Sequence, residues 1–376
     1  MDQNKSITIP TELLPSDGRF GSGPSLVRKE AVQALADIAP EYLGTSHRQN
    51  TVREMVKRLQ NGLLDLFHLP HGWEILLGNG GATLFWDIAT FGLIESQSQH
   101  LVFGEFSSKF AQATTNAPHL SSPEIIESEY GFAPVPEPSD VDLYALTQNE
   151  TSTGVALQLK RPKEVASNQA IVAVDATSAA GGMLWDPKEV DCYYFSPQKS
   201  FASDGGLWIA ACSPAAVDRI EKISASNRWV PAGLDLKIAL DNSRKNQTYN
   251  TPSLSTIFLA VHQIEWINEQ GGLEWSAGRS KESSTHLYNW AEQHQYVQPF
   301  VTNSDLQSPV VVTLDIDEKI SADDLVFACK ENGILDIGGY RKLGRNQIRI
   351  ATFPAIEPAD IRTLTKSIDY LMELLL

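Results

Sequence analysis

The sequence predicts an α/β protein, with a large domain built on a mostly parallel sheet covered by helices and a smaller C-terminal α+β domain. Short apolar runs alternate with segments of helical periodicity over the first two thirds of the chain. This alternation is typical of buried parallel strands with helices on both faces. Two long helical segments then interrupt it. The chain of 376 residues, 42% of them hydrophobic, is long enough to form two cores.

The elements of the large domain follow one another in order. Residues 49–67 carry apolar side chains at helical spacing, which predicts a helix with one buried face. The apolar run at residues 73–77 predicts a strand, because a glycine-rich turn follows it at once. We expect further strands at residues 101–103, 143–146, 170–174, 193–195 and 207–211, and helices at residues 82–93, 107–115 and 214–225.

The last third of the chain has a different pattern. Residues 254–269 and 272–295 predict two successive helices, and we expect the domain boundary between them. Beyond them we expect strands at residues 310–316, 334–337 and 348–351, and helices at residues 322–332 and 358–375. The chain is therefore divided into a polar leader (1–16), expected to be disordered or a loose arm, a large domain (17–270) and a small domain (271–376). A cleft between two such domains commonly binds a small ligand.

The charge balance argues against two classes of partner. Lys and Arg number 30 and Asp and Glu 46, so the net charge is −16. A general nucleic-acid binder and a protein that docks on an anionic membrane both need a basic face. The polar start lacks the apolar region of a secretory signal, and no apolar run approaches the roughly 20 residues of a transmembrane helix. We therefore expect a cytoplasmic protein without a nucleic-acid or membrane partner.

The three cysteines predict neither a disulfide framework nor a metal site. Cys192, Cys212 and Cys329 are widely spaced and form no CxxC pair. We expect all three to be buried, as small hydrophobic side chains in a reducing compartment.

Three features of the large domain together indicate the kind of ligand that it binds. The glycine-rich turn at residues 78–83 offers backbone N–H groups to a phosphate, although a tight turn is its more ordinary role. Asp175 ends a buried strand and so faces the crevice of the sheet, unless it only caps the next turn. Lys199 leaves another strand into a loop of small residues, where a lysine can lose its proton and attack a carbonyl, although a lone lysine is usually solvated. A phosphate cradle, an acid for a ring nitrogen and a lysine for a Schiff base are what pyridoxal phosphate (PLP) requires.

The small domain carries a local reversal of charge. No acidic residue occurs between Asp336 and Glu357, although the chain as a whole is acidic. The cations of this stretch are Arg341, Lys342, Arg345 and Arg349. Guanidinium groups bind carboxylate and phosphate with paired hydrogen bonds, so the stretch is a candidate anion site, with a solvated basic hairpin as the alternative. His47 and Arg48 form a second candidate cation pair.

These motifs resemble those of the phosphoserine aminotransferases, a family of class V, fold-type I PLP enzymes. The resemblance extends from Phe20 nearly to the end of the chain, and GNGGATLFWD is similar to the form in the actinobacterial branch. It rests on the segments FGSGPS, TSHR, GNGGAT, QNETSTG, VDATSAAGG, FSPQKSF and YNTPS, together with the C-terminal arginine stretch.

The resemblance implies a PLP site. Lys199 would form the Schiff base, and Asp175 would pair with the pyridine nitrogen. The other cofactor-binding residues implied are Ala82, Thr83 and Gln198 at the phosphate, Phe106 on the ring and Thr151 at the phenolic oxygen. Asn250 and Thr251 would reach the cofactor phosphate of the neighbouring subunit, so the resemblance also implies a homodimer with two shared sites.

The resemblance also implies the substrate contacts. The carboxylate end of the substrate would be held by Ser22, Arg48 and Arg349, and its phosphate by Arg341 with His47. Many members have Trp where this chain has Phe106 and His where it has Tyr340, and the interval from Arg341 to Arg349 is longer than usual. Arg345 and Lys342 are therefore alternatives at the phosphate.

The activity implied is the transfer of an amino group from L-glutamate to 3-phosphohydroxypyruvate, which gives O-phospho-L-serine and 2-oxoglutarate. Serine biosynthesis would use this reaction, and pyridoxine biosynthesis is a second candidate. The alternatives within class V are alanine–glyoxylate or serine–pyruvate transfer and, less well matched, a cysteine desulfurase. A non-catalytic protein that kept the PLP fold is the alternative from another class.

Overall fold

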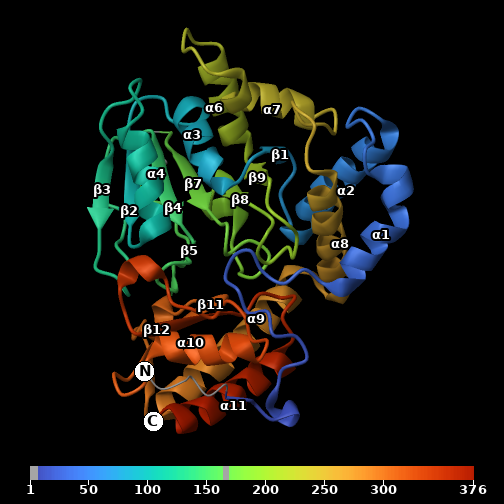
Figure 1. The fold of residues 1–376 in the computed structure, drawn as a ribbon. Helices are drawn as coiled ribbons and strands as arrows, with labels where there is room; N and C mark the ends of the chain where they lie inside the picture. Colours follow the sequence, from blue (N-terminus) through green and yellow to red (C-terminus); the bar gives the residue numbers. More distant parts are fainter. Residues whose placement is uncertain (1–6, 164–168) are drawn as a thin grey trace.

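The computed structural model describes residues 7–163 and 169–376, and its centre is a seven-stranded sheet (Figure 1). The strands are ordered β1-β9-β8-β7-β4-β2-β3. Their bounds are β1 (Glu74–Asn79), β2 (Ser98–Val102), β3 (Glu124–Glu127), β4 (Leu143–Thr147), β7 (Ile171–Asp175), β8 (Cys192–Phe195) and β9 (Leu207–Cys212). Strand β9 runs antiparallel to β1 and β8, and every other neighbouring pair is parallel. The predicted mostly parallel sheet is confirmed.

Helices cover both faces of this sheet. They are α1 (Lys29–Tyr42), α2 (Asn50–Leu66), α3 (Ala82–Gly92), α4 (Glu105–Thr115), α6 (Pro214–Ser224), α7 (Leu236–Ser243) and α8 (Leu254–Gln270). Strand β7 shows the arrangement, because Val172 and Val174 join the core under α2 and α8 while Ile171 and Ala173 join the core under α3 and α6. The sequence pattern did not predict α1, α7 or the edge strand β3.

The C-terminal unit is a three-stranded antiparallel sheet packed with helices, drawn in orange and red in Figure 1. Its elements are α9 (Gly272–Gln293), β10 (Val297–Pro299), β11 (Val311–Ile316), α10 (Ala322–Glu331), β12 (Gln347–Ala351) and α11 (Pro358–Leu375). The strand expected at residues 334–337 is wrong. Only isolated bridges form there, through Leu335 and Gly338, because Asp336 has a φ of +62° and breaks the extended backbone.

The N-terminal segment packs against the C-terminal unit. Ile9 is buried in the core of that unit, and its N–H donates to Oδ1 of Asn332 at 2.8 Å. The amide of Asn332 donates in turn to the carbonyl oxygen of Ile7 at 2.7 Å, and the N–H of Ser16 donates to Asp360 at 2.7 Å. The expectation of a loose arm is therefore wrong for residues 7–16, and residues 1–6 lie outside the described part of the chain.

Two further sequence observations have a structural counterpart. The three cysteines are free and buried, and the Sγ atoms of Cys192 and Cys212 lie 4.0 Å apart on neighbouring strands. Within residues 7–163 and 169–376, no helix combines the length and the apolar character needed to cross a membrane.

Candidate active site

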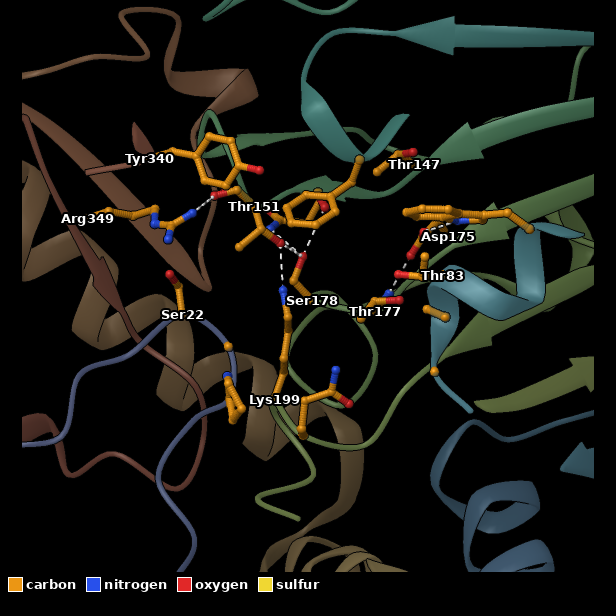
Figure 2. Close-up of a pocket in the computed structure, with 18 residues that line it drawn as sticks. Ser22, Thr83, Thr147, Thr151, Asp175, Thr177, Ser178, Lys199, Tyr340 and Arg349 are labelled. Carbon is orange, nitrogen blue, oxygen red and sulfur yellow. Dashed lines mark hydrogen bonds between the residues drawn. The ribbon is translucent and has the colours of Figure 1, made fainter. Parts of the chain in front are cut away.

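A cavity of about 270 Å³ lies where the carboxyl ends of β4 and β7 meet residues that follow β8. Parallel strands bring their carboxyl ends to one edge of a sheet, which is where open α/β folds bind ligands. Figure 2 shows Asp175, Thr177 and Thr83 on one side of Lys199, and Ser22, Tyr340 and Arg349 on the other. The residues predicted from the sequence that line this cavity are Ser22, Ala82, Thr83, Phe106, Thr151, Asp175, Gln198, Lys199 and Arg349.

Lys199 lies at the centre of the cavity. Its Nζ donates to Oγ1 of Thr151 at 2.8 Å, and the side chain is buried. The pKa of Lys199 is lowered to about 7, mainly by burial and next by the nearby charge of Arg349, against the opposite effect of Asp175 and Glu150. The lysine therefore exposes a neutral amine to the cavity at a pH where most lysines are protonated.

A glycine allows the N-terminal segment to approach this lysine closely. Gly23 has a φ of +145°, and a Cβ atom built on it would lie 2.8 Å from Cε of Lys199. Any larger residue at position 23 would meet the lysine side chain. The segment FGSGPS, far from Lys199 in the sequence, thus forms one wall of the cavity.

The hydroxyl of Thr151 belongs to a short chain of hydrogen bonds. Oγ1 of Thr151 donates to Oγ of Ser178 at 2.9 Å, and Ser178 donates to the carbonyl oxygen of Asn149 at 2.9 Å. The side-chain amide of Asn149 donates to the same Ser178 oxygen at 2.8 Å. Because the proton of Thr151 is directed toward Ser178, a lone pair of its oxygen is left for Lys199. Sequence reasoning missed Ser178, although it lies three positions after Asp175 in the same loop.

Asp175 is held at both carboxylate oxygens. Oδ1 accepts from the backbone N–H of Thr177 at 2.9 Å, which is the turn cap considered from the sequence, and Oδ2 accepts from Nε1 of Trp86 at 3.0 Å. In the described part of the chain Asp175 has no ion pair, so neutral donors alone hold this buried carboxylate. A cationic partner in the cavity suits such a group. Sequence reasoning missed Trp86, which follows Thr83 by three positions and so shares a face of α3 with it.

Several polar atoms of the cavity wall suit a polar ligand. The start of α3 has no side-chain cap at Gly81, so its first N–H groups face the cavity beside Ala82 and Thr83. Among the described residues, five buried polar atoms of the wall have no hydrogen-bond partner. They are Oγ of Ser22, Oδ1 of Asn149, Oγ1 of Thr177, Oε1 of Gln198 and Nε of Arg349. Donors and acceptors are mixed in this set, as a phosphorylated pyridine aldehyde requires.

Aromatic rings and an arginine close the side of the cavity away from Asp175. The ring centre of Phe106 lies 5.6 Å from Nζ of Lys199 and 6.1 Å from the ring centre of Tyr340. Arg349 lies with its Cζ 5.4 Å from the centre of the Tyr340 ring and donates to the carbonyl oxygen of Thr151 at 2.8 Å. Burial lowers the pKa of Arg349, but a guanidinium stays charged at neutral pH.

The structure separates the four cations of the C-terminal stretch. Arg345 makes a bidentate pair with Asp315 at 3.0 and 2.6 Å, and Lys342 pairs with Glu105. In the described part of the chain Arg341 has no ion pair or side-chain hydrogen bond. It lines an adjoining hollow together with Arg349.

Besides Arg341, four predicted residues lie outside this cavity, namely His47, Arg48, Asn250 and Thr251. Nδ1 of His47 lies 3.1 Å from Oγ1 of Thr251, and Arg48 donates to Gln247 at 3.2 Å. Asn250, the fourth residue, lines a different hollow. The structure therefore brings His47 and Thr251 together, next to Arg48, and none of the three lines the cavity of Lys199.

Comparisons with known proteins identify relatives of the whole chain. Residues 138–341 match the family model described as aminotransferase class-V. The chain is 52% identical over 369 residues to a phosphoserine aminotransferase of Nocardioides, covering 98% of this chain and 99% of the relative. It is also 52% identical over 367 residues to one of Corynebacterium glutamicum, covering 97% of each chain. The crystal structure of a phosphoserine aminotransferase from Cytophaga hutchinsonii shares the fold, with a TM-score of 0.86 at 22% identity over 94% of this chain and 99% of that one.

Proposed function

Because the chain belongs to the phosphoserine aminotransferase family of class V, PLP-dependent aminotransferases, we propose that it moves an amino group from L-glutamate to 3-phosphohydroxypyruvate. The products are 2-oxoglutarate and O-phospho-L-serine. One observation carries the proposal: the buried amine of Lys199, whose pKa is lowered, shares its cavity with Arg349, and Arg341 lies beside that cavity. A lysine of this kind suits amine exchange, and the arginines suit a substrate with two anionic groups.

The cavity fits PLP by the chemistry of its wall. When bound, PLP supplies an aldehyde that condenses with amines and a pyridinium ring that takes up electrons from the substrate carbon. The residues that would hold it are Ala82, Thr83 and Gln198 at the phosphate, Asp175 at the ring nitrogen, Thr151 at the phenolic oxygen and Phe106 on the ring. Asp175 lacks an ion pair within the described residues and Gln198 has an unpartnered oxygen, so each has capacity for such a contact.

Lys199 performs the proton transfers in this proposal. Its Nζ would hold the aldehyde carbon of the cofactor in the resting enzyme and would be a free amine once substrate is bound. The free amine then removes the proton from Cα of the substrate and later returns a proton as the general acid. A pKa near 7 suits the roles of base and acid. At neutral pH part of the amine is free to accept a proton, and the protonated part is acidic enough to donate one.

Arginines would hold the two ends of the substrate. Arg349, with the hydroxyl of Ser22, lies close enough to Lys199 to hold the α-carboxylate. Arg341 in the adjoining hollow would receive the phosphate of phosphoserine and, in the other half of the cycle, the side-chain carboxylate of glutamate. We do not assign the phosphate to Arg345 or Lys342, because Asp315 and Glu105 already occupy them.

We propose a homodimer with shared sites. His47, Arg48 and Thr251 do not line the cavity of their own chain, and in this proposal a second copy brings such residues to the substrate and the cofactor phosphate. An exposed aromatic side chain beside this group supports an interface, because Tyr249, two positions before Thr251, is 45% exposed. In this arrangement His47 assists Arg341 at the phosphate and Arg48 assists at the carboxylate.

We propose the cytoplasm as the location and serine biosynthesis as the pathway. The three free, buried cysteines suit a reducing compartment. A second role in pyridoxine biosynthesis is part of the proposal, since its longer phosphorylated keto acid carries the same two anionic groups.

The domain division at residue 270 is likewise a proposal, supported by Gly271, which separates α8 from α9.

A visible absorption titration tests the substrate. The PLP-loaded protein is titrated with O-phospho-L-serine and, separately, with L-alanine, while the absorbance of the bound cofactor is followed. We expect phosphoserine to bleach the band and alanine to leave it nearly unchanged. Equal bleaching by alanine would favour alanine–glyoxylate or serine–pyruvate transfer, and no change with either amine would favour a non-catalytic protein.

A further inference from the structure

Glu150 is a buried carboxylate that the proposed reaction does not use. It lies on the short strand β5 (Asn149–Glu150), between two residues that line the cavity. Side chains alternate along an extended backbone, so Asn149 and Thr151 face the cavity while Glu150 points away from it. It is fully buried, with an exposed fraction of 0%.

The carboxylate of Glu150 holds the first turn of α4. It accepts from the backbone N–H groups of Phe106, at 3.1 Å, and Ser107, at 2.9 Å, and from the hydroxyl of Ser107 at 2.9 Å. It also accepts from the N–H and the hydroxyl of Ser152, at 3.2 and 2.7 Å. Helix α4 has no side-chain cap of its own at Gly104, and a negative charge at a helix N-terminus is favourable. Glu150 therefore serves as the cap of α4 from a distant part of the chain.

Two neighbouring residues leave little freedom in this contact. A Cβ atom built on Gly104 would lie 2.3 Å from Cγ of Glu150, so only glycine allows the helix start to approach so closely. The hydroxyl oxygen of Ser152 accepts the N–H of Glu105 at 3.0 Å. Three successive N–H groups of α4, at residues 105–107, are thus tied to residues 150–152.

We propose that Glu150 is a positioning residue that sets the Phe106 ring at a fixed height above Lys199 and Thr151. Phe106 lies in the first turn of α4, which Glu150 holds in place. Thr151 follows Glu150 directly in the chain. One carboxylate therefore fixes the aromatic face and the hydroxyl of the cofactor site relative to each other. The inference rests on the proposed function for the roles of Phe106 and Thr151 toward PLP.

The test compares Glu150→Gln with the wild-type protein in two measurements. The substitution keeps the size of the side chain but removes its charge and turns an amide donor toward backbone donors. Amide hydrogen exchange, measured without added PLP, should rise at residues 105–107. In the PLP-loaded protein, release of the cofactor into a large excess of a trapping aldehyde reagent should be about 10-fold faster, the effect expected for a lost charged hydrogen bond.

Asp142→Asn is the matched control. Its carboxylate also accepts three backbone N–H groups, those of residues 95–97 at 2.8, 2.6 and 2.8 Å, but it does not line the cavity. This variant should lose thermal stability and release PLP at the wild-type rate. If Glu150→Gln behaves in the same way, with unchanged exchange at residues 105–107, then Glu150 is only structural and the inference is overturned.

A double-mutant cycle with Phe106→Leu tests whether the effect passes through the aromatic ring. Glu150→Gln should not accelerate PLP release further in the Phe106→Leu background. An equal acceleration in both backgrounds would overturn the inference.

Should Glu150→Gln fail to fold, Ser107→Ala and Ser152→Ala each remove one hydroxyl donor and serve in its place. If the wild-type protein does not retain PLP, the proposed function fails, and the exchange measurement still decides whether Glu150 orders the helix start.

Discussion

Nζ of Lys199 lies 2.8 Å from Oγ1 of Thr151, and that hydroxyl in turn donates to Oγ of Ser178 at 2.9 Å. The lysine nitrogen is thereby held at one place in the cavity, below the ring of Phe106. Burial is the larger reason that its pKa falls to about 7, and the charge of Arg349 is the second.

The rate of PLP uptake by the cofactor-free protein should depend on pH through Lys199. Only the neutral amine attacks the aldehyde, so the rate should rise around pH 7 and level off about one unit above it. Stopped-flow absorbance between pH 6 and pH 11 measures this. A rise centred near the ordinary lysine value of 10.5 would contradict the lowered pKa.

Replacing Lys199 with methionine should stabilise the cofactor-free protein, most strongly at low pH. Between pH of about 7 and 10.5 the unfolded chain keeps a proton that the folded chain has released, so the free energy of unfolding of the wild-type protein rises with pH in this window. Below pH 7 the folded protein bears the full cost of a buried charge. Denaturant unfolding at pH 6 and pH 10 should show a larger gain for Lys199→Met at pH 6, and an equal gain at both would contradict the shift.

Trp86→Phe should impair turnover while leaving the fold intact. The ring is retained, but Oδ2 of Asp175 loses its only donor among the described residues at that oxygen. We expect kcat/KM to fall about 10-fold, the size of a lost hydrogen bond to a charged group. Steady-state kinetics measure this, with Trp208→Phe as a control, since Trp208 is buried outside the cavity. An unchanged kcat/KM would mean that Trp86 does not orient the carboxylate.

The arginines should differ in what they recognise. Arg349→Gln should raise KM for both glutamate and phosphoserine by about 100-fold, because it removes a charged partner from a buried site. Arg341→Gln should affect phosphoserine more than an amino acid with no second anionic group. Arg345→Gln is the control, since its pairing with Asp315 is expected to matter for stability rather than binding. A larger loss of phosphoserine affinity in Arg345→Gln than in Arg341→Gln would reverse the assignment.

Two inactive variants should restore activity when they are mixed. Lys199→Ala lacks the amine, and the pair Asn250→Ala with Thr251→Ala lacks the residues that a second copy is proposed to supply. A hybrid dimer has one intact site, so refolding equal amounts together should recover about a quarter of wild-type activity. Activity assays with mass measurement in solution test this, and no recovery from a mixture that does form dimers would contradict the shared site.

Much of the site could be predicted from short stretches of sequence. Asp175 and Lys199 follow apolar runs of strand length, and parallel strands necessarily bring their carboxyl ends to one edge of a sheet. The helix start at Ala82 follows from the glycines before it. The strand expected at residues 334–337 failed because a positive φ at Asp336 depends on the surrounding structure rather than on hydrophobicity.

The sequence by itself determined most of the strands and helices, the sheet class and the candidate residues at strand ends, because these follow from local periodicity and from residue type. Only the tertiary structure decided which partners those residues have. Trp86 reaches Asp175 across 89 positions and Lys342 reaches Glu105 across 237 positions, which no local pattern encodes. The N-terminal segment joined the C-terminal core for the same reason, since Ile9 is buried only by residues that lie far along the chain. Periodicity is a property of neighbours in sequence, whereas hydrogen-bond partners are settled by the packing of the whole molecule.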